Sequence, residues 1–380
     1  MKIPFNRPTA VGAELDNIAD ALARGHLSGD GHYTRRCHQW LERRLGCKHA
    51  LLTHSCTGAL DMAAILCDLV PGDEVIMPSY TFVSTANAFV LRGAMPVFVD
   101  IRTDTLNIDE RLIEAAITPR TRAIAVVHYA GVACEMDAVM ALARRHNLLV
   151  VEDAAQALLA TYKNRNLGTL GHLGCISFHE TKNLISGEGG ALLINDERYA
   201  ERAEIVREKG TNRSRFLRGE VDKYTWVDIG SSYLPSELVA AFLDGQLAHA
   251  DQVIARRRAI WRRYHAGLTE LAASGALELP RAAYLDRVPN GHIFYVLTGT
   301  LAARLALAAH LKAQDMLSVS HYVPLHSSPA GRKWGRASGE LKVTDDVSDR
   351  LLRLPIYFGI TDAQVDAVID AVRGFYKARA

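Results

Sequence analysis

The amino-acid sequence predicts an α/β fold, with a large domain built on a largely parallel sheet and a smaller C-terminal α+β domain. From Val75 onward, short apolar runs alternate with amphipathic segments. After Tyr233 this alternation gives way to a long stretch with apolar residues at helical spacing, and the rest mixes short strands with helices. We therefore expect a large domain over residues 1–245 and a small domain over residues 246–380.

The expected strands of the large domain are short apolar runs. They are Glu74–Met77, Pro96–Asp100, Ala123–His128, Leu148–Glu152, Cys175–Phe178 and Ala191–Asn195. Amphipathic segments such as Leu112–Ile117 and Met136–His146 lie between them and predict helices. Strands that alternate with helices form βαβ units, so the strands should run mostly parallel.

The C-terminal third is expected to begin with a long helix that starts at Ser236 and continues beyond Trp261 toward Gly275. A helix of this length would bridge the two domains. The small domain would then contain strands at His292–Leu297 and Val319–Tyr322, and helices near Ala302–Gln314 and Thr361–Tyr376.

Composition excludes several classes of function. With 380 residues, of which 49% are hydrophobic, the chain can bury a substantial core. A formal net charge of +2, from 44 basic and 42 acidic residues, gives no field that would favour nucleic acid or a membrane surface. No apolar stretch approaches the length of a membrane span, and the N-terminus lacks a signal-peptide core.

The six cysteines show neither the Cys-x-x-Cys spacing nor the nearby histidines of a zinc site, so no metal site is expected. They are typical of reduced, mostly buried thiols in a cytoplasmic protein.

Lys182 is the most informative residue of the chain. It lies in Ser177–Asn183, directly before the glycine-rich turn Gly187–Gly190 and the strand-like run Ala191–Ile194. A lysine between apolar strands loses hydration and gives up its proton more readily, and such a lysine can form a Schiff base. An isolated lysine would otherwise be a solvated surface group.

Asp153 ends the apolar run in Leu148–Gln156, which is typical of a buried parallel strand. Open α/β sheets bind ligands at the carboxyl ends of their strands, so Asp153 is a candidate partner for a pyridinium nitrogen. The alternative is a helix N-cap that opens Ala154–Gln156. Pyridoxal phosphate requires a lysine for its aldehyde, a carboxylate for its ring nitrogen and donors for its phosphate.

The segment Thr53–Leu60 is a candidate phosphate site, because it follows an apolar run and opens a helix-like stretch through Leu66. Hydroxyl residues at a helix start leave backbone N–H groups free and place them at the positive end of the helix dipole. An ordinary capped helix is the alternative interpretation.

Four motifs of the chain resemble motifs that occur in the same order in the DegT/DnrJ/StrS family of pyridoxal-phosphate-dependent nucleotide-sugar aminotransferases. The motifs are Pro78–Asn87, Val127–Gly131, Glu152–Gln156 and Ser177–Asn183. The resemblance implies the type I fold of these enzymes, with a mostly parallel seven-stranded sheet in the large domain.

The resemblance also implies the role of each cofactor-site residue. Lys182 would bond to the cofactor aldehyde and Asp153 would pair with the ring nitrogen. Gln156 would contact the ring hydroxyl and Phe82 would stack on the ring. The phosphate would be held by the amides of Cys56 and Thr57 and by the hydroxyl of Ser177.

More variable stretches resemble family members that move the amino group of L-glutamate to C4 of TDP-4-oxo-6-deoxy-D-glucose, giving TDP-4-amino-4,6-dideoxy-D-galactose. These stretches are Ile3–Asn6, Ser28–Gly31, Tyr33–Cys37, Glu208–Ser214 and Asp222–Trp226. Relatives that act at C3 or give the gluco product would share the same cofactor motifs.

Family members are dimers with active sites shared between subunits, so we expect a homodimer. Many carry a Gly-x-Asn-Tyr-Arg segment whose asparagine reaches the partner's phosphate, whereas this chain reads Gly230–Leu234 without the asparagine or the arginine. Ser232 could still donate a hydrogen bond there.

A basic cluster follows the large domain's last strand and is a candidate clamp for the substrate's diphosphate, with a solvated loop as the alternative. Arg213 and Arg215 are its central members, and the others are Arg207, Lys209, Arg218 and Lys223. Tyr322 and His326 lie in a segment that the family places near the active site, and they are further candidates for substrate contacts.

Two other classes of protein are alternatives to an aminotransferase. A binding or regulatory protein could keep the fold without turnover. A nicotinamide-dependent oxidoreductase would need a Gly-x-Gly-x-x-Gly turn after its first strand, which is absent.

Overall fold

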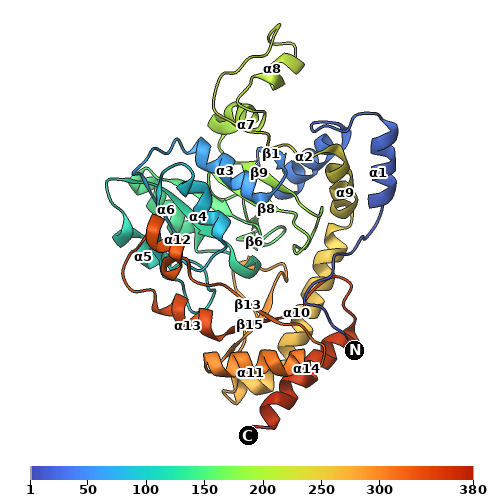
Figure 1. The fold of residues 1–380 in the computed structure, drawn as a ribbon, viewed down its shortest axis with the longest axis vertical. Coiled ribbons are helices and arrows are strands. Elements are labelled where there is room, and N and C mark those ends of the chain that lie inside the picture. Colours follow the sequence, from blue (N-terminus) through green and yellow to red (C-terminus); the bar gives the residue numbers. More distant parts are fainter. Residues whose placement is uncertain (1, 380) are drawn as a thin grey trace.

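The computed structural model describes residues 2–379. Its central feature is an eight-stranded sheet that runs across the larger part of the molecule (Figure 1). In spatial order its strands are β1 (His49–Thr53), β9 (Gly190–Ile194), β8 (Leu173–Ser177), β5 (Leu149–Asp153), β4 (Thr121–Val127), β2 (Glu74–Pro78), β3 (Met95–Val99) and β14 (Arg336–Ala337). Strand β9 runs antiparallel to the other seven strands, which are parallel to one another, so the predicted mostly parallel sheet is confirmed.

Six of the eight strands are those expected from the sequence. Strand β1 contains the apolar run Ala50–Leu52, and β14 is a further addition. The edge strand β14 comes from the C-terminal third of the chain and pairs in parallel with β3. Two residues are too few to give a periodic signal, so the sequence pattern did not predict it.

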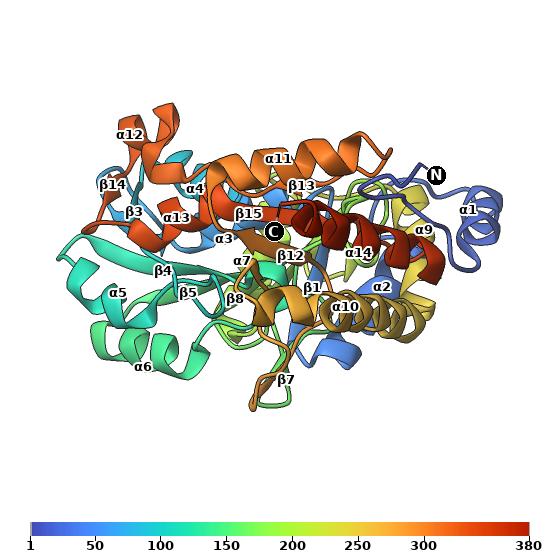
Figure 2. The ribbon, with the colours of Figure 1, turned by 90° about the horizontal axis from the view of Figure 1, so that it is seen from below.

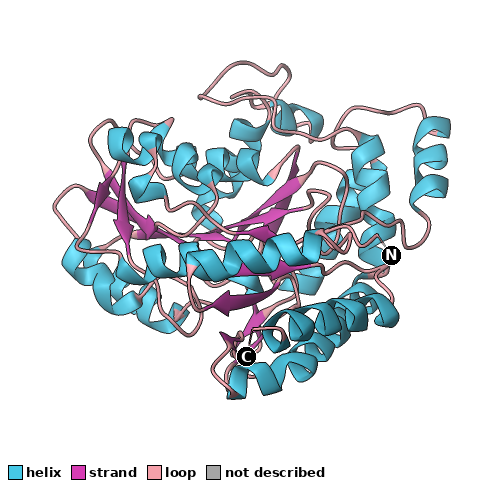
Figure 3. Cartoon of the chain, turned by 60° about the horizontal axis from the view of Figure 1, so that its bottom comes forward, coloured by secondary structure: helices cyan, strands magenta, loops and turns pink. Residues whose placement is uncertain are grey.

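Helices cover both faces of the large sheet because successive strand residues point to opposite sides (Figures 2 and 3). In β4, Ile124 and Val126 belong to one buried cluster and Ala123 and Ala125 to the other. The second face is covered by α3 (Cys56–Leu66), α4 (Val83–Val90) and α7 (Ala200–Arg207). The first face is covered by α2 (His32–Leu45), α5 (Glu110–Ala116), α6 (Met136–His146) and α9 (Glu237–Ala248).

The C-terminal part contains an antiparallel four-stranded sheet with its own buried cluster. Its strands are β10 (Leu277–Glu278), β12 (Phe294–Thr298), β15 (Leu351–Leu354) and β13 (Val319–Ser320). The helices packed with it are α10 (Ala250–Ala273), α11 (Leu301–Lys312) and α14 (Asp362–Lys377), at the bottom of Figure 1.

The remaining elements connect or extend these two sheets. A small sheet contains β11 (Arg287–Val288), β6 (Thr161–Tyr162) and β7 (Arg165–Asn166). Further helices are α1 (Glu14–Ala23), α8 (Arg213–Leu217), α12 (Pro329–Trp334) and α13 (Lys342–Arg350). Three short 3₁₀ turns lie at Tyr129–Gly131, Glu197–Tyr199 and Leu325–Ser327.

The prediction of one continuous helix from Ser236 onward is wrong. The chain instead forms two helices, α9 and α10, that meet at His249. The backbone of His249 leaves the helical region, with φ −107° and ψ 15°. Gly12 of the N-terminal arm lies so close that a Cβ atom there would be 2.2 Å from the His249 ring. The break therefore occurs where the arm packs against the helix pair, which a periodic pattern cannot reveal.

The proposed domain boundary between residues 245 and 246 remains a prediction. The start of α10 packs in the first-face cluster, and Leu325 and Leu341 pack in the second, so segments on both sides of the boundary contribute to the large sheet's cores.

All six cysteines are buried and unpaired. Among residues 2–379, no helix has both the length and the apolar character needed to cross a membrane.

Candidate active site

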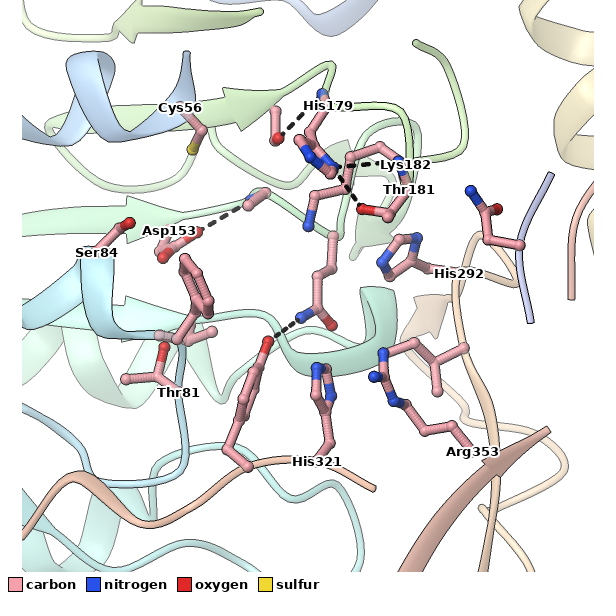
Figure 4. Close-up of a pocket in the computed structure, with 18 of the residues that line it drawn as sticks. Cys56, Thr81, Ser84, Asp153, His179, Thr181, Lys182, His292, His321 and Arg353 are labelled. Carbon is pink, nitrogen blue, oxygen red and sulfur yellow. Dashed lines mark hydrogen bonds between the residues drawn. The ribbon is translucent and has the colours of Figure 1, made fainter. Parts of the chain in front are cut away.

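A cavity of about 510 Å³ lies where the two main sheets approach each other. The large sheet contributes side chains from the carboxyl ends of β5 and β8, as expected for an open α/β sheet. The C-terminal part contributes His292, His321, Tyr322 and Arg353, and the N-terminal arm contributes Phe5. Figure 4 shows the side chains of Asp153, Lys182, His292, His321 and Arg353 around a common space.

Lys182 lies in the turn that joins β8 to β9, and its side chain points into the cavity (Figure 4). The amide of Glu180 donates to the carbonyl of Gly187 at 2.8 Å, and Gly187 has a φ of 79° that favours glycine. Burial lowers the pKa of Lys182 because water no longer stabilises the ammonium, and the nearby cation of Arg353 acts in the same direction. The Lys182 ammonium therefore gives up its proton, and becomes nucleophilic, more readily than that of a solvated lysine.

Asp153 is the last residue of β5 and is buried, with 6% of its surface exposed. Its carboxylate accepts hydrogen bonds from the Thr85 hydroxyl at 2.6 Å and from the Ala155 amide at 3.1 Å. The Thr85 proton is used in this bond, so the Thr81 hydroxyl, 2.8 Å away, must donate to Thr85. Asp153 is thus oriented by a short chain of hydroxyl groups.

The start of α3 meets the strand ends at the far side of the cavity. Ser55 caps the helix by accepting a hydrogen bond from the Gly58 amide at 3.0 Å. The preceding amides of Cys56 and Thr57, both cavity-lining residues, remain available at the positive end of the helix. Gly190 allows this close approach, since a Cβ atom there would be 2.4 Å from the Cys56 nitrogen.

Gln156 and Tyr322 form the wall between the two sheets. Gln156 accepts a hydrogen bond from the Ala130 amide at 2.7 Å and donates one to the Tyr322 hydroxyl at 2.9 Å. Phe82 also lines the cavity and is 57% exposed, which is unusual for a phenylalanine in a cavity wall. A planar ring in the cavity would cover its exposed face.

Two histidines complete the wall near Lys182. Burial lowers the pKa of His321 to about 2, and burial with the neighbouring cations of Lys182 and Arg257 lowers the pKa of His292 well below its usual value. Both rings are therefore neutral at physiological pH. His292 is held by a 2.8 Å hydrogen bond to Asn183, and His321 stacks on Tyr322 with ring centres 3.6 Å apart.

The structure brings most of the predicted site residues together. The cavity is lined by Lys182, Asp153, Gln156, Phe82, Cys56, Thr57, Ser177 and Tyr322. Their assigned roles toward the cofactor and substrate remain predictions.

Four predicted residues do not line the cavity. Arg213 pairs with Glu208 at 2.6 Å and Arg215 with Glu220 at 3.1 Å, because the acidic residues nearby neutralise the basic cluster. His326 instead bonds the Ser79 hydroxyl at 2.8 Å. Ser232 is exposed, beside the same segment of chain. A role for Arg213, Arg215 or Ser232 would therefore require the active site of a second subunit.

Sequence reasoning missed Thr85, His292 and Arg353. Thr85 lies within the motif Pro78–Asn87, three residues after Phe82, but nothing in the motif shows that its hydroxyl bonds to Asp153. Arg353 did carry a signal, since it is the one charged residue in the strand Leu351–Leu354. A charged side chain inside an apolar strand needs a buried partner or a ligand.

The residues of the cavity fit pyridoxal phosphate. Among residues 2–379, the buried carboxylate of Asp153 forms no ion pair, and a buried carboxylate without a cation is costly. A protonated ring nitrogen would supply that cation. The free amides at the start of α3 suit a phosphate dianion, and the Lys182 amine, whose pKa is lowered by burial, suits an aldehyde.

Comparisons with known proteins agree with this fit. The spore coat polysaccharide biosynthesis protein SpsC of Bacillus subtilis is 33% identical over 99% of this chain and 97% of its own length. GDP-perosamine synthase of Caulobacter vibrioides is 32% identical over 98% of this chain and 97% of its own. The crystal structure of the aminotransferase TlmJ from Streptoalloteichus hindustanus superposes with a TM-score of 0.92 at 30% identity and covers 100% of both chains.

Residues 8–373 match the DegT/DnrJ/EryC1/StrS aminotransferase family over nearly the whole chain. This match confirms the family and the type I aminotransferase fold expected from the sequence motifs. The chain belongs to the DegT/DnrJ/EryC1/StrS family of sugar aminotransferases, whose members bind pyridoxal phosphate.

Proposed function

We propose that the protein transfers the amino group of L-glutamate to C4 of TDP-4-oxo-6-deoxy-D-glucose, giving TDP-4-amino-4,6-dideoxy-D-galactose and 2-oxoglutarate. This is the reaction of the transaminase of enterobacterial common antigen synthesis. The observation that carries the proposal is the unpaired, buried carboxylate of Asp153 in the same cavity as the amine of Lys182.

Bound pyridoxal phosphate would supply an electron sink for the carbanion that forms when an amino acid loses its α-proton. Lys182 would hold the aldehyde, and once displaced its amine would accept the α-proton from the donor and later return a proton to the sugar carbon. The lowered pKa of Lys182 supports this role, since an amine that loses its proton more readily than a solvated lysine is a better base at a given pH.

Asp153 would keep the proton on the ring nitrogen. The hydrogen bonds from Thr85 and Ala155 hold its carboxylate in one orientation. Gln156 would contact the ring hydroxyl, and Phe82 would cover the ring. The cofactor phosphate would accept hydrogen bonds from the amides of Cys56 and Thr57 and from the hydroxyl of Ser177. The neutral rings of His292 and His321 add no positive charge that would compete with the ring nitrogen for Asp153.

The sugar substrate is proposed from the sequence. The stretches Ile3–Asn6 and Ser28–Gly31 resemble family members that use TDP-4-oxo-6-deoxy-D-glucose. In the structure, Phe5 and Asn6 of the first stretch line the cavity. Glu237 anchors the second stretch by accepting a hydrogen bond from the Gly31 amide at 3.0 Å. The first stretch therefore borders the cavity, and the second is anchored to α9 through Glu237.

We also propose that the protein is a cytoplasmic homodimer with active sites shared between subunits. The segment 208–230 projects from the large sheet at the top of Figure 1 and carries exposed apolar side chains, including Trp226 at 77% exposure. An exposed apolar cluster of this kind is typical of an interaction surface. A partner's arm would also bring Arg213, Arg215 and Ser232 toward the neighbouring cavity, where they could bind the diphosphate and the cofactor phosphate.

The test is an assay with TDP-4-oxo-6-deoxyglucose and L-glutamate, with the configuration of the new C4 amine determined by NMR. A galacto-configured 4-amino sugar is expected. A gluco product, or amination at C3, would support the alternative member of the same family. If glutamate leaves the absorbance of the bound cofactor unchanged, the protein is a binder rather than an enzyme.

A further inference from the structure

A second cavity, of about 280 Å³, lies beside the active site. Its walls come from α10, from residues 280–291 between β10 and β12, and from the turn that follows β4. Ile293 lines both cavities, so the two share a wall. The side chains assigned to pyridoxal phosphate line the first cavity and not the second. The cofactor therefore does not account for the chemistry of the second cavity.

The lining of the second cavity is positively charged. Four arginines contribute to it: Arg258, Arg262, Arg281 and Arg287. Among residues 2–379, no aspartate or glutamate lines this cavity. Arg287 is neutralised by ion pairs with Glu135 and Asp286, each at 2.8 Å. The other three arginines form no ion pair within the part of the chain that the structure describes, so three positive charges are left without a partner.

Two of these unpaired arginines repel each other. Arg258 is half-buried, and burial lowers its pKa; the charge of Arg262, one turn along α10, lowers this pKa further. The Nε atom of Arg258 donates to the Pro289 carbonyl at 2.8 Å, whereas its Nη atoms donate to no group among residues 2–379. An anion that accepts hydrogen bonds from both guanidinium groups would relieve the repulsion. The cavity therefore favours a strong anion such as a phosphate.

Aromatic and small apolar side chains form the rest of the lining. Trp261 is fixed in place, because its indole N–H donates to the Ile293 carbonyl at 3.1 Å and one face of its ring stacks on His265. The ring centre of Tyr284 lies 5.4 Å from the guanidinium carbon of Arg281. The small apolar side chains are Ala130, Val132, Ala282, Ala283 and Val288. Walls of this kind suit a planar ring, which aromatic side chains bind by stacking.

A nucleoside phosphate combines the two chemical features that this lining requires. Its base and ribose would cover the aromatic and apolar walls, and its phosphate would accept charge-assisted hydrogen bonds from the arginines. Inorganic phosphate would leave the apolar walls in water, and an uncharged ring would leave the arginines unpaired. A volume of about 280 Å³ lies at the lower limit for ligand pockets, which favours a mononucleotide over a larger nucleotide sugar.

Two hydrogen bonds connect the second cavity to the active site. Gly291 lines the second cavity, and its carbonyl accepts a hydrogen bond at 3.3 Å from Arg257, which lines the first. Ala130 also lines the second cavity, and its amide donates at 2.7 Å to Gln156, the residue expected to contact the cofactor's ring hydroxyl. A ligand that shifts either backbone segment would therefore move a side chain of the active site.

We propose that the second cavity is an effector site, which binds a nucleoside monophosphate and thereby changes how the active site responds to its substrates. The site is separate from the one that would hold the cofactor and the sugar. Binding of the effector does not depend on which sugar the protein aminates.

Titration of the holoenzyme with adenosine 5′-monophosphate and thymidine 5′-monophosphate tests binding through the fluorescence of Trp261. The nucleotides should change this fluorescence saturably, and the change should be absent in Trp261→Phe. The half-saturating concentration should rise about 10- to 100-fold in the double variant Arg262→Gln/Arg281→Gln, because charge-assisted hydrogen bonds are lost. It should stay unchanged in the control Arg145→Gln, whose arginine is 62% exposed and pairs with Glu114.

Two partial ligands test the class of effector. Adenosine lacks the phosphate and inorganic phosphate lacks the base, so each should bind about tenfold or more weakly than adenosine 5′-monophosphate. A fluorescence change that persists in Trp261→Phe, or equal affinities of the native protein and the double variant, would place nucleotide binding elsewhere and overturn the proposal. No response to either nucleotide would also overturn it.

The effect on the active site is measured with L-glutamate. At saturating nucleotide, the glutamate concentration for half-maximal loss of cofactor absorbance should shift by about fivefold or more in the native protein. The double variant should keep the native value and show no shift. Nucleotide binding without any shift in the native protein would refute an effector role. If glutamate never changes the absorbance, the proposed aminotransferase function fails, whereas the fluorescence titration still decides whether the nucleotide site exists.

Discussion

At the scale of single residues, Lys182 is the side chain on which the proposed chemistry depends most. We expect Lys182→Ala to lower kcat by about 10²- to 10⁴-fold, because the variant lacks both the covalent anchor and the proton carrier. Steady-state turnover with glutamate and the oxo-sugar would measure this. A variant that kept the native rate would remove the basis of the proposed mechanism.

Thr85 provides a finer test, because it acts through Asp153. Thr85→Val removes the 2.6 Å hydrogen bond to the carboxylate and leaves Asp153 less well oriented. A hydrogen bond to a charged group is worth about 1.5–3 kcal/mol, so cofactor affinity should fall by about 10- to 100-fold. Thr85→Ser keeps the hydroxyl and should bind nearly as the native protein does. Equal affinity of the valine and serine variants would contradict this role.

The lowered pKa of Lys182 predicts how the apo-protein takes up its cofactor. Only the neutral amine attacks an aldehyde, so the rate of pyridoxal phosphate capture should rise with pH as Lys182 loses its proton. Because the pKa lies below the usual value of 10.5, the rise should level off at a lower pH than for a free lysine. Stopped-flow absorbance at several pH values measures the midpoint, and a midpoint at or above that of free lysine would count against a desolvated amine.

Sequence reasoning found the residues that carry a distinctive chemical type in a local motif, such as Lys182 after β8 and Asp153 at the end of β5. It could not find partners that come from distant segments. Thr85 and Asp153 are 68 positions apart in the sequence, and Arg353 reaches the cavity from the other sheet. Such contacts depend on packing between elements, and no local pattern encodes them.

At the scale of elements, the contact between β9 and α3 sets the geometry of the expected phosphate site. We predict that Gly190→Ala weakens pyridoxal phosphate binding at least tenfold, because the new methyl group would push against the backbone of Ser55 and Cys56. Equilibrium titration of the apo-protein with the cofactor would show this.

Gly374→Ala is the matched control for Gly190→Ala. Gly374 lies within α14, and a Cβ atom there meets nothing within 4 Å. The control should leave cofactor affinity unchanged and raise the free energy of unfolding by about 0.5–1 kcal/mol, since alanine favours helix. If both variants bind the cofactor as tightly as the native protein, the close approach of β9 to α3 does not shape the site.

The elements that the sequence predicted are the long, strongly patterned ones. Helix α6 has the predicted bounds, and both ends of β5 lie one residue later than predicted. The two-residue strands β6, β7, β11 and β14 were not predicted, because their pairing depends on neighbours in space rather than on their own composition. The break at His249 was missed for the same reason.

At the scale of the whole molecule, the projecting segment 208–230 predicts self-association. Trp226→Ser should shift sedimentation toward the monomer and make activity depend on protein concentration, because it removes the most exposed large apolar side chain of the segment. Leu285→Ser, at a fully exposed position elsewhere, is the control and should leave sedimentation unchanged. A native protein that sediments as a fully active monomer would rule out shared active sites.

The short strand β14 has a consequence for how the polypeptide can be divided. A fragment that stopped before Gly335 would leave β3 as the outermost strand, with its backbone N–H and C=O groups open on one side. Bare edges of this kind recruit other chains and promote aggregation. Strand β14 thus covers the outer edge of the first sheet, and fragments that lack it should precipitate even though they retain Lys182 and Asp153.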